Sequence, residues 1–187
     1  MQLVIFAWGN PTRGDDGLGP AMAHRIRAFL EQHPRHSGVE IVEDVQLQVE
    51  HALDLENGDL ALFIDASAIC DPPFAFTLVQ RFRETHLTSH VLSPEALLQV
   101  YFEIHGGEAP PSFLLSVRGD RFELGEGLGE TAQANLRAAW SLAEGLFQDI
   151  DAHRWELLRS DRLEGTELGN RMDHPALPQC ATGVNSR

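Results

Sequence analysis

The sequence contains no lysine, and each of its 14 basic residues is an arginine. A chain without lysine cannot form a Schiff base with a substrate and cannot supply the lysine of a phosphate-binding P-loop. Its 28 acidic residues give a formal net charge of −14. Because nucleic acids and anionic membranes bind to basic surfaces, this charge argues against both as partners.

Cysteines and long apolar runs are also scarce. The two cysteines, Cys70 and Cys180, lie far apart and form no CxxC pattern, which is typical of a reduced protein rather than a disulfide scaffold. No apolar run approaches the ~18 residues that a membrane span requires, and the N-terminal residues lack the basic start of a signal peptide. We therefore expect a cytoplasmic protein without a membrane partner.

Short apolar runs instead alternate with amphipathic stretches along the chain. The expected strands are 3–7, 39–42, 59–65, 74–79 and 113–117, and the expected helices are 17–33, 49–55, 94–102 and 131–150. This alternation predicts a three-layer α/β/α fold with a mostly parallel sheet. The link between the third and fourth strands is too short for a crossover helix, so one strand should be antiparallel.

The charge and composition change after about residue 150. Residues 1–150 are predicted to form a single domain that carries most of the negative charge. Residues 151–187 are nearly neutral and are expected to form a C-terminal extension. The extension should be helical at first and poorly ordered towards its proline-rich end.

Three segments place polar residues near strand ends, where ligands bind in open α/β sheets. The first is the glycine-rich loop 9–19. Its glycine spacing does not match a dinucleotide-binding loop, and Asp15 and Asp16 would repel a pyrophosphate. Asp15 is interpreted as a helix cap or turn residue. Asp16 is harder to explain in this way, because a second adjacent carboxylate is costly unless a cation or an arginine offsets it.

The other two segments contain Asp65 and His90. Asp65 ends an otherwise apolar strand, where a lone carboxylate is more often functional than structural, although it could cap the next turn. His90 is one of nine histidines and is a weak signal by itself. If Asp16, Asp65 and His90 converge, they would form a ligand set with open positions, suited to nickel, zinc or a similar divalent ion.

The motifs together resemble the hydrogenase maturation protease family. The similarity rests on GNPTRGDDGLGP at residues 9–20, on Asp65-Ala66, and on Ser89-His90 followed by PEALL at 94–98. The stretch FELGEGLG at residues 122–129 also resembles the family, and the similarity covers about residues 3–148. It implies a twisted five-stranded sheet flanked by helices. It also implies a peptidase that removes the C-terminal extension of the [NiFe]-hydrogenase large-subunit precursor after nickel insertion.

The resemblance also implies a site and a partner. Asp16, Asp65 and His90 would recognise nickel that the substrate supplies, with no organic cofactor, and their catalytic roles cannot be separated from metal recognition. The family has Glu or Asp at the position of Asp16. Many members have a Gly-Gly-Thr-like segment where residues 44–51 read DVQLQVEH. Together with Trp8-Gly9-Asn10-Pro11, this departure resembles proteases that serve soluble, NAD-reducing hydrogenases. The segment 44–51 is expected to contact the substrate.

No other peptidase mechanism is indicated by the sequence. It contains no G-x-S-x-G nucleophile elbow and no HExxH helix, and neither cysteine adjoins a motif histidine. We therefore hypothesise that the catalytic metal arrives with the substrate. Two alternatives stay open: a non-catalytic, nickel-dependent binding module or chaperone for the immature large subunit, and a small-molecule hydrolase with its own metal.

Overall fold

Strand β1 (Leu3–Trp8) lies inside the sheet, and all six of its residues are buried. Its side chains alternate between two hydrophobic clusters, because successive residues of a strand point to opposite faces. Leu3, Ile5 and Ala7 belong to one cluster, and Val4, Phe6 and Trp8 belong to the other. A strand covered on both faces is apolar throughout, and this explains the unbroken hydrophobic run near the start of the sequence.

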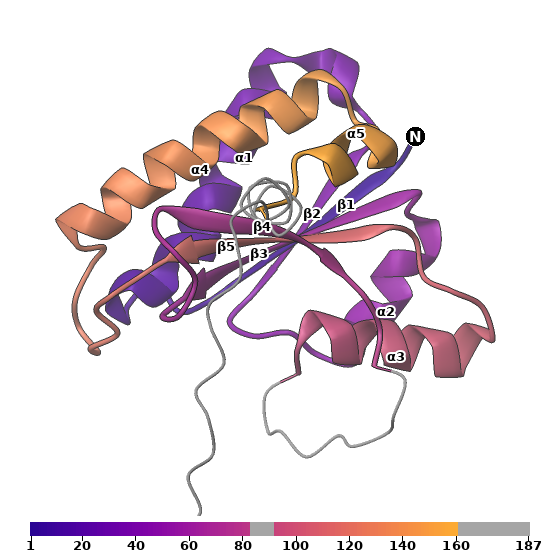
Figure 1. Cartoon of the computed structure of the whole chain (residues 1–187), viewed down its shortest axis with the longest axis horizontal. Coiled ribbons are helices and arrows are strands. Elements are labelled where there is room, and N and C mark those ends of the chain that lie inside the picture. The colour runs from indigo at the N-terminus through magenta and orange to yellow at the C-terminus, as the bar shows by residue number, and fades with distance from the viewer. Residues whose placement is uncertain (83–91, 161–187) are drawn as a thin grey trace, which may run out of the picture.

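The computed structural model describes residues 1–82 and 92–160, which include a five-stranded sheet in the order β2-β1-β3-β5-β4 (Figure 1). The other strands are β2 (Val39–Asp44), β3 (Leu60–Ser67), β4 (Phe74–Val79) and β5 (Ser112–Arg118). All neighbouring pairs are parallel except β4 and β5. The predicted mostly parallel α/β sheet with one antiparallel strand is therefore confirmed.

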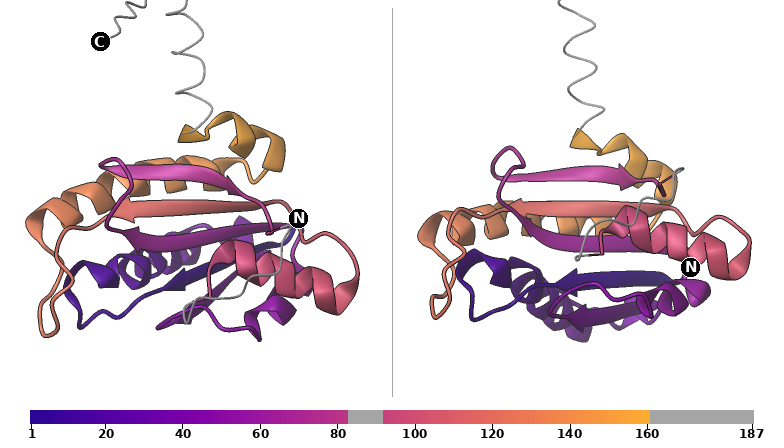
Figure 2. Two further views of the ribbon diagram at one scale, coloured as in Figure 1. Left: turned by 60° about the horizontal axis from the view of Figure 1, so that its bottom comes forward. Right: turned by 90° about the horizontal axis from the view of Figure 1, so that it is seen from below.

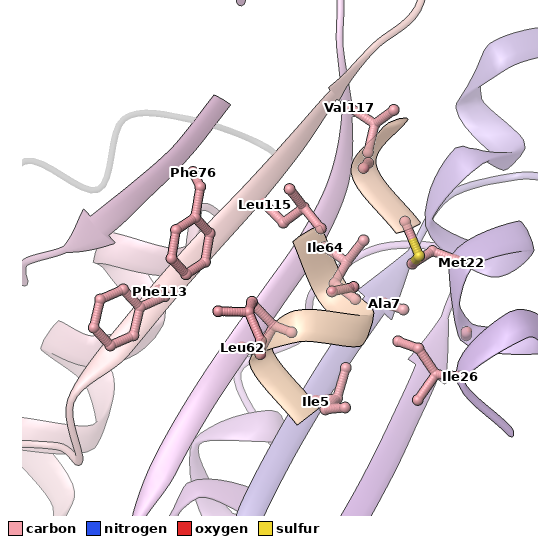
Figure 3. Packing of buried hydrophobic residues seen from close by; sticks show 14 of the residues in the cluster. Ile5, Ala7, Met22, Ile26, Leu62, Ile64, Phe76, Phe113, Leu115 and Val117 are labelled. Carbon is pink, nitrogen blue, oxygen red and sulfur yellow. The ribbon is translucent and has the colours of Figure 1, made fainter. Parts of the chain in front are cut away.

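Helices cover both faces of this sheet (Figure 2). One face carries α1 (Leu18–Gln32), α4 (Glu130–Gln148) and α5 (Ala152–Leu157), and the other carries α2 (His51–Asp54) and α3 (Pro94–His105). The described residues also include three short 3₁₀ turns, which are η1 (Gly14–Gly17), η2 (Pro34–His36) and η3 (Leu55–Asn57). On the first face, Met22 and Ile26 of α1 pack towards the strand residues Ile5, Ala7 and Ile64 (Figure 3).

Helix α3 begins and ends where local chemistry dictates. The Ser93 hydroxyl oxygen accepts a hydrogen bond from the Ala96 backbone N–H at 3.3 Å, and Pro94 occupies the first helical position. Gly106 ends the helix in the left-handed conformation, with φ of 70°. The predicted start is confirmed, and the helix continues to His105, three residues beyond the predicted end.

The short helix α5 packs onto the sheet through Trp155. This side chain is fully buried, and its ring lies edge-on to the rings of Phe76 in β4 and Phe113 in β5. Its indole N–H faces the carbonyl oxygens of Leu146 and Asp149 at 3.3 Å each. Residues 161–187 lie outside the described residues. Within the described ranges, no helix combines the length and apolar character that crossing a membrane would take.

Candidate functional site

The loop between β1 and α1 folds tightly against the strand ends. Gly9 has a φ of +133°, and a Cβ atom there would lie 2.0 Å from the Asp16 carbonyl oxygen. A Cβ atom on Gly19 would lie 2.1 Å from the Trp8 carbonyl oxygen. Larger residues at these two positions would push the loop away from β1. The glycines therefore allow the turn η1, which carries Asp16, to sit directly on the end of the sheet.

Asp16 is half-buried, and its carboxylate is held from one side. Its Oδ2 atom accepts a hydrogen bond from the Asn10 backbone N–H at 2.9 Å. The Asn10 side-chain oxygen in turn accepts bonds from the backbone N–H and the hydroxyl of Thr12, at 2.9 and 2.7 Å. The Asn10 side chain thus fixes the local turn, and the turn presents a backbone donor to Asp16.

Asp65 lies in the last half of β3, opposite Ser116 of β5. The strand continues to Ser67, two residues further than predicted. The Oδ1 atom of Asp65 accepts a hydrogen bond from the Ala66 backbone N–H at 2.8 Å. Burial raises the pKa of Asp65 to about 7; the Ala66 bond opposes this rise, and the nearby negative charge of Asp16 adds to it.

The structure thus brings Asp16 and Asp65 together at the carboxyl ends of β1 and β3. They come from separate segments and are close enough for the charge of one to shift the pKa of the other. The third predicted site residue, His90, lies in segment 83–91, outside the described residues. Among the residues that the structure describes, no three His, Cys, Asp or Glu side chains gather in a group that could hold a metal ion. The described part of the site is therefore a carboxylate pair.

Asp15 has a different role from its neighbour Asp16. Its side chain is only 2% exposed, and it accepts hydrogen bonds from the backbone N–H groups of Asp120, Arg121 and Gly129. Burial alone would raise the pKa of Asp15, but these three donors and the Arg121 charge outweigh it and lower the pKa below its usual value. The sequence indicated a structural role correctly. Of the two expected roles, the helix cap is wrong, because no side chain caps η1 or α1, whereas the turn residue is confirmed, because Asp15 lies within η1.

Sequence patterns could not identify the partners of Asp15. The three donors are backbone groups that lie 105 to 114 residues further along the chain. Every non-proline residue has such a donor, so the sequence carries no mark of which ones Asp15 contacts. The resemblance of residues 122–129 to the family did not indicate that this part of the chain contacts Asp15.

Comparison with known proteins relates this chain to others by its fold. No protein-family model and no curated protein matches the sequence. Among solved structures, the hydrogenase maturating endopeptidase HybD from Escherichia coli is similar over 79% of this chain and 93% of its own, with 19% identity and a TM-score of 0.59. The [NiFe] hydrogenase maturation protease HycI from Thermococcus kodakarensis KOD1 is similar over 76% of this chain and 90% of its own, with 20% identity and a TM-score of 0.57. The endopeptidase HycI from Escherichia coli has 16% identity and a TM-score of 0.56, over 78% of this chain and 91% of its own. This chain therefore shares the fold of these proteins.

Proposed function

We propose that this chain is an endopeptidase that removes the C-terminal extension from the precursor of a [NiFe]-hydrogenase large subunit after nickel insertion. The observation that carries the proposal is the pair of carboxylates, Asp16 and Asp65, at the carboxyl edge of the sheet. Ligands of open α/β sheets bind at this edge. The fold shared with the endopeptidases HybD and HycI supports the same activity.

In this proposal the metal is part of the substrate. Asp16, Asp65 and His90 would coordinate the nickel of the precursor. Three protein ligands leave coordination positions open for groups of the substrate. Asp65, whose pKa is about 7, would bind the cation in its ionised form and release its proton on docking. No organic cofactor takes part.

The coordinated metal then determines which peptide bond is cut. Docking at the carboxylates would hold the scissile bond close to nickel in one orientation. Nickel can polarise the carbonyl of that bond, and a carboxylate can direct a water molecule onto it. A precursor without nickel would lack the group that the site holds. Cleavage would therefore report that metal insertion is complete.

The test is a processing assay with a matching large-subunit precursor. The purified protein is incubated with nickel-loaded and nickel-free precursor, and the products are weighed by mass spectrometry. We expect loss of a C-terminal peptide from the nickel-loaded precursor alone. Equal cleavage of both forms would overturn metal recognition, and nickel-dependent binding without cleavage would favour the non-catalytic binding module instead.

The proposed partner is the precursor of a soluble, NAD-reducing hydrogenase. This choice rests on the resemblance of residues 44–51 and of the Trp8–Pro11 segment to the corresponding protease subgroup. The same assay tests it when precursors of two hydrogenase classes are offered together. Preferential cleavage of a precursor from the other class would overturn the subgroup and leave the proposed peptidase activity intact.

A further inference from the structure

The loop that joins β5 to α4, residues 119–129, runs beside the loop that carries Asp16 (Figures 1 and 2). Backbone hydrogen bonds join the two loops in both directions. The Gly14 N–H donates to the Glu126 carbonyl at 2.9 Å, and the Gly125 N–H donates to the Thr12 carbonyl at 2.7 Å. These contacts attach a distant part of the chain to the candidate site.

Asp15 is the centre of this attachment. Its own N–H donates to the Arg121 carbonyl at 2.7 Å. Its Oδ2 atom accepts from the N–H groups of Asp120 and Arg121 at 2.8 and 2.9 Å, and its Oδ1 atom accepts from the Gly129 N–H at 2.8 Å. Gly129 is the N-cap residue, which directly precedes α4. One buried carboxylate therefore fastens both ends of the loop to the turn η1.

Asp16 follows Asp15 in the same short turn, and the two side chains have different partners. Asp15 contacts the loop 119–129. Asp16 instead contacts Asn10, and its negative charge raises the pKa of Asp65. A turn of four residues cannot rotate at one of these positions without moving the other. The bonds of Asp15 therefore determine how the Asp16 carboxylate is presented at the sheet edge.

We propose that Asp15 is a positioning residue, which acts through Asp16 by fastening the turn η1 to the loop 119–129. The inference rests on the proposed function, because Asp16 is the residue expected to meet the metal of the substrate. It assigns Asp15 no contact with substrate or metal. A displacement of about 1 Å at a reacting group can lower a rate by about 100-fold, so a partial loss of this attachment should be measurable.

The test uses Asp15→Asn, which keeps the shape of the side chain but presents an NH₂ group to at least one backbone donor. The matched control is Asn135→Ala. Asn135 is 6% exposed, and its amide donates to the Arg118 carbonyl at 2.9 Å, so it holds the adjacent end of β5 by a bond that does not involve η1. At a temperature at which both variants are folded, Asp15→Asn should lower kcat/KM for nickel-loaded precursor about tenfold. Asn135→Ala should stay within about twofold of the wild type, since it leaves the η1 attachment in place.

A second measurement separates positioning from a general structural role. The affinity for nickel-loaded precursor is measured with and without Asp15→Asn, in the wild type and in an Asp16→Ala background. If Asp15 acts through Asp16, the change should weaken binding only where Asp16 is present. An equal loss in both backgrounds, or a wild-type rate for Asp15→Asn, would overturn the inference while leaving the proposed function intact. Full processing by Asp16→Ala would instead overturn the proposed site and the inference with it.

If Asp15→Asn does not fold, the milder variant Arg13→Met is used to test the inference. The exposed Arg13 side chain donates from Nε to the Phe122 carbonyl at 3.1 Å and so joins the same two loops from outside. Arg13→Met removes this bond without emptying a buried position. It should lower kcat/KM about threefold, because one of several bonds is lost. A rate equal to that of the wild type would overturn the inference.

Discussion

Two regions of the molecule bury a carboxylate, and the pKa values of the two carboxylates shift in opposite directions. In the first, Asp15 is surrounded by three backbone N–H donors from the loop 119–129, and its pKa is lowered. In the second, Asp65 has one backbone donor and faces the charge of Asp16, and burial raises its pKa to about 7. The two regions adjoin, since Asp15 and Asp16 are consecutive residues.

This difference distinguishes a structural acid from a binding acid. The donors of Asp15 already compensate its negative charge, so a further cation has little to add. Asp16 and Asp65 accept one backbone hydrogen bond each, so a divalent cation would compensate negative charge that the protein leaves without a partner. Burial alone would not have separated the two roles; the number of donors does.

The largest effect is expected from substitutions of the two carboxylates that would bind the cation. Asp16→Asn and Asp65→Asn should each lower processing of nickel-loaded precursor by about 10³-fold, equivalent to about 4 kcal/mol, because each removes a charge aimed at the cation. Melting temperatures should change little. Asp59→Asn is the control, because Asp59 binds the Gln2 N–H at the opposite edge of the sheet. Processing at the wild-type rate by either site variant would remove that residue from the site.

The next largest effect is a loss of stability when the buried carboxylate of Asp15 is removed. Asp15→Ala should lower the free energy of unfolding by about 3 kcal/mol, because it removes a buried carboxylate that is the acceptor of three backbone N–H groups. Asp16→Ala should cost less than about 1 kcal/mol, since its carboxylate accepts one bond in a half-buried turn. Urea unfolding of the two variants measures the contrast. Similar losses would show that the two adjacent acids do not differ in structural role.

A smaller effect is the pH dependence of stability that results from the raised pKa of Asp65. A carboxyl group whose pKa is raised in the folded state stabilises the fold at low pH, and this contribution is lost as pH rises through the folded pKa. For Asp65 the loss should extend from about pH 4 to about pH 7. The wild type should therefore lose about 2–3 kcal/mol relative to Asp65→Asn between pH 5 and pH 8, because about two pH units of this range lie below the folded pKa. Urea unfolding at both pH values measures the difference, and parallel pH profiles would contradict the raised pKa.

The sequence predicts the fold well because its signals are local. The apolar run at 3–7, the buried run at 59–65 and the Ser93-Pro94 helix start each lie within a few residues. Parallel strands bring their carboxyl ends to one edge, so the approach of Asp16 to Asp65 also follows from the order of the elements. The antiparallel strand follows from the shortness of one connection.

Other features depend on tertiary packing and leave no local pattern. The burial of Trp155 against Phe76 and Phe113 depends on where α5 docks. The strand β3 extends to Ser67 because Ala66 and Ser67 pair with β5, which no residue preference near Asp65 indicates. The bonds of Asp15 join positions more than one hundred residues apart. The place of His90 in the site stays a prediction.

The smallest effect concerns Asp15 at acid pH and has the opposite sign. A carboxylate whose pKa is lowered in the folded state stabilises the fold above its unfolded pKa, and this contribution is lost as pH falls through the folded value. Asp15→Asn should therefore lose less stability than the wild type between pH 5 and pH 3, although it is less stable at both. Urea unfolding at these two pH values compares the slopes. If the Asn variant lost as much stability at acid pH as the wild type, the three backbone donors would not be stabilising an ionised carboxylate. The pKa of Asp15 would then not be lowered, and the contrast with Asp65 would be wrong.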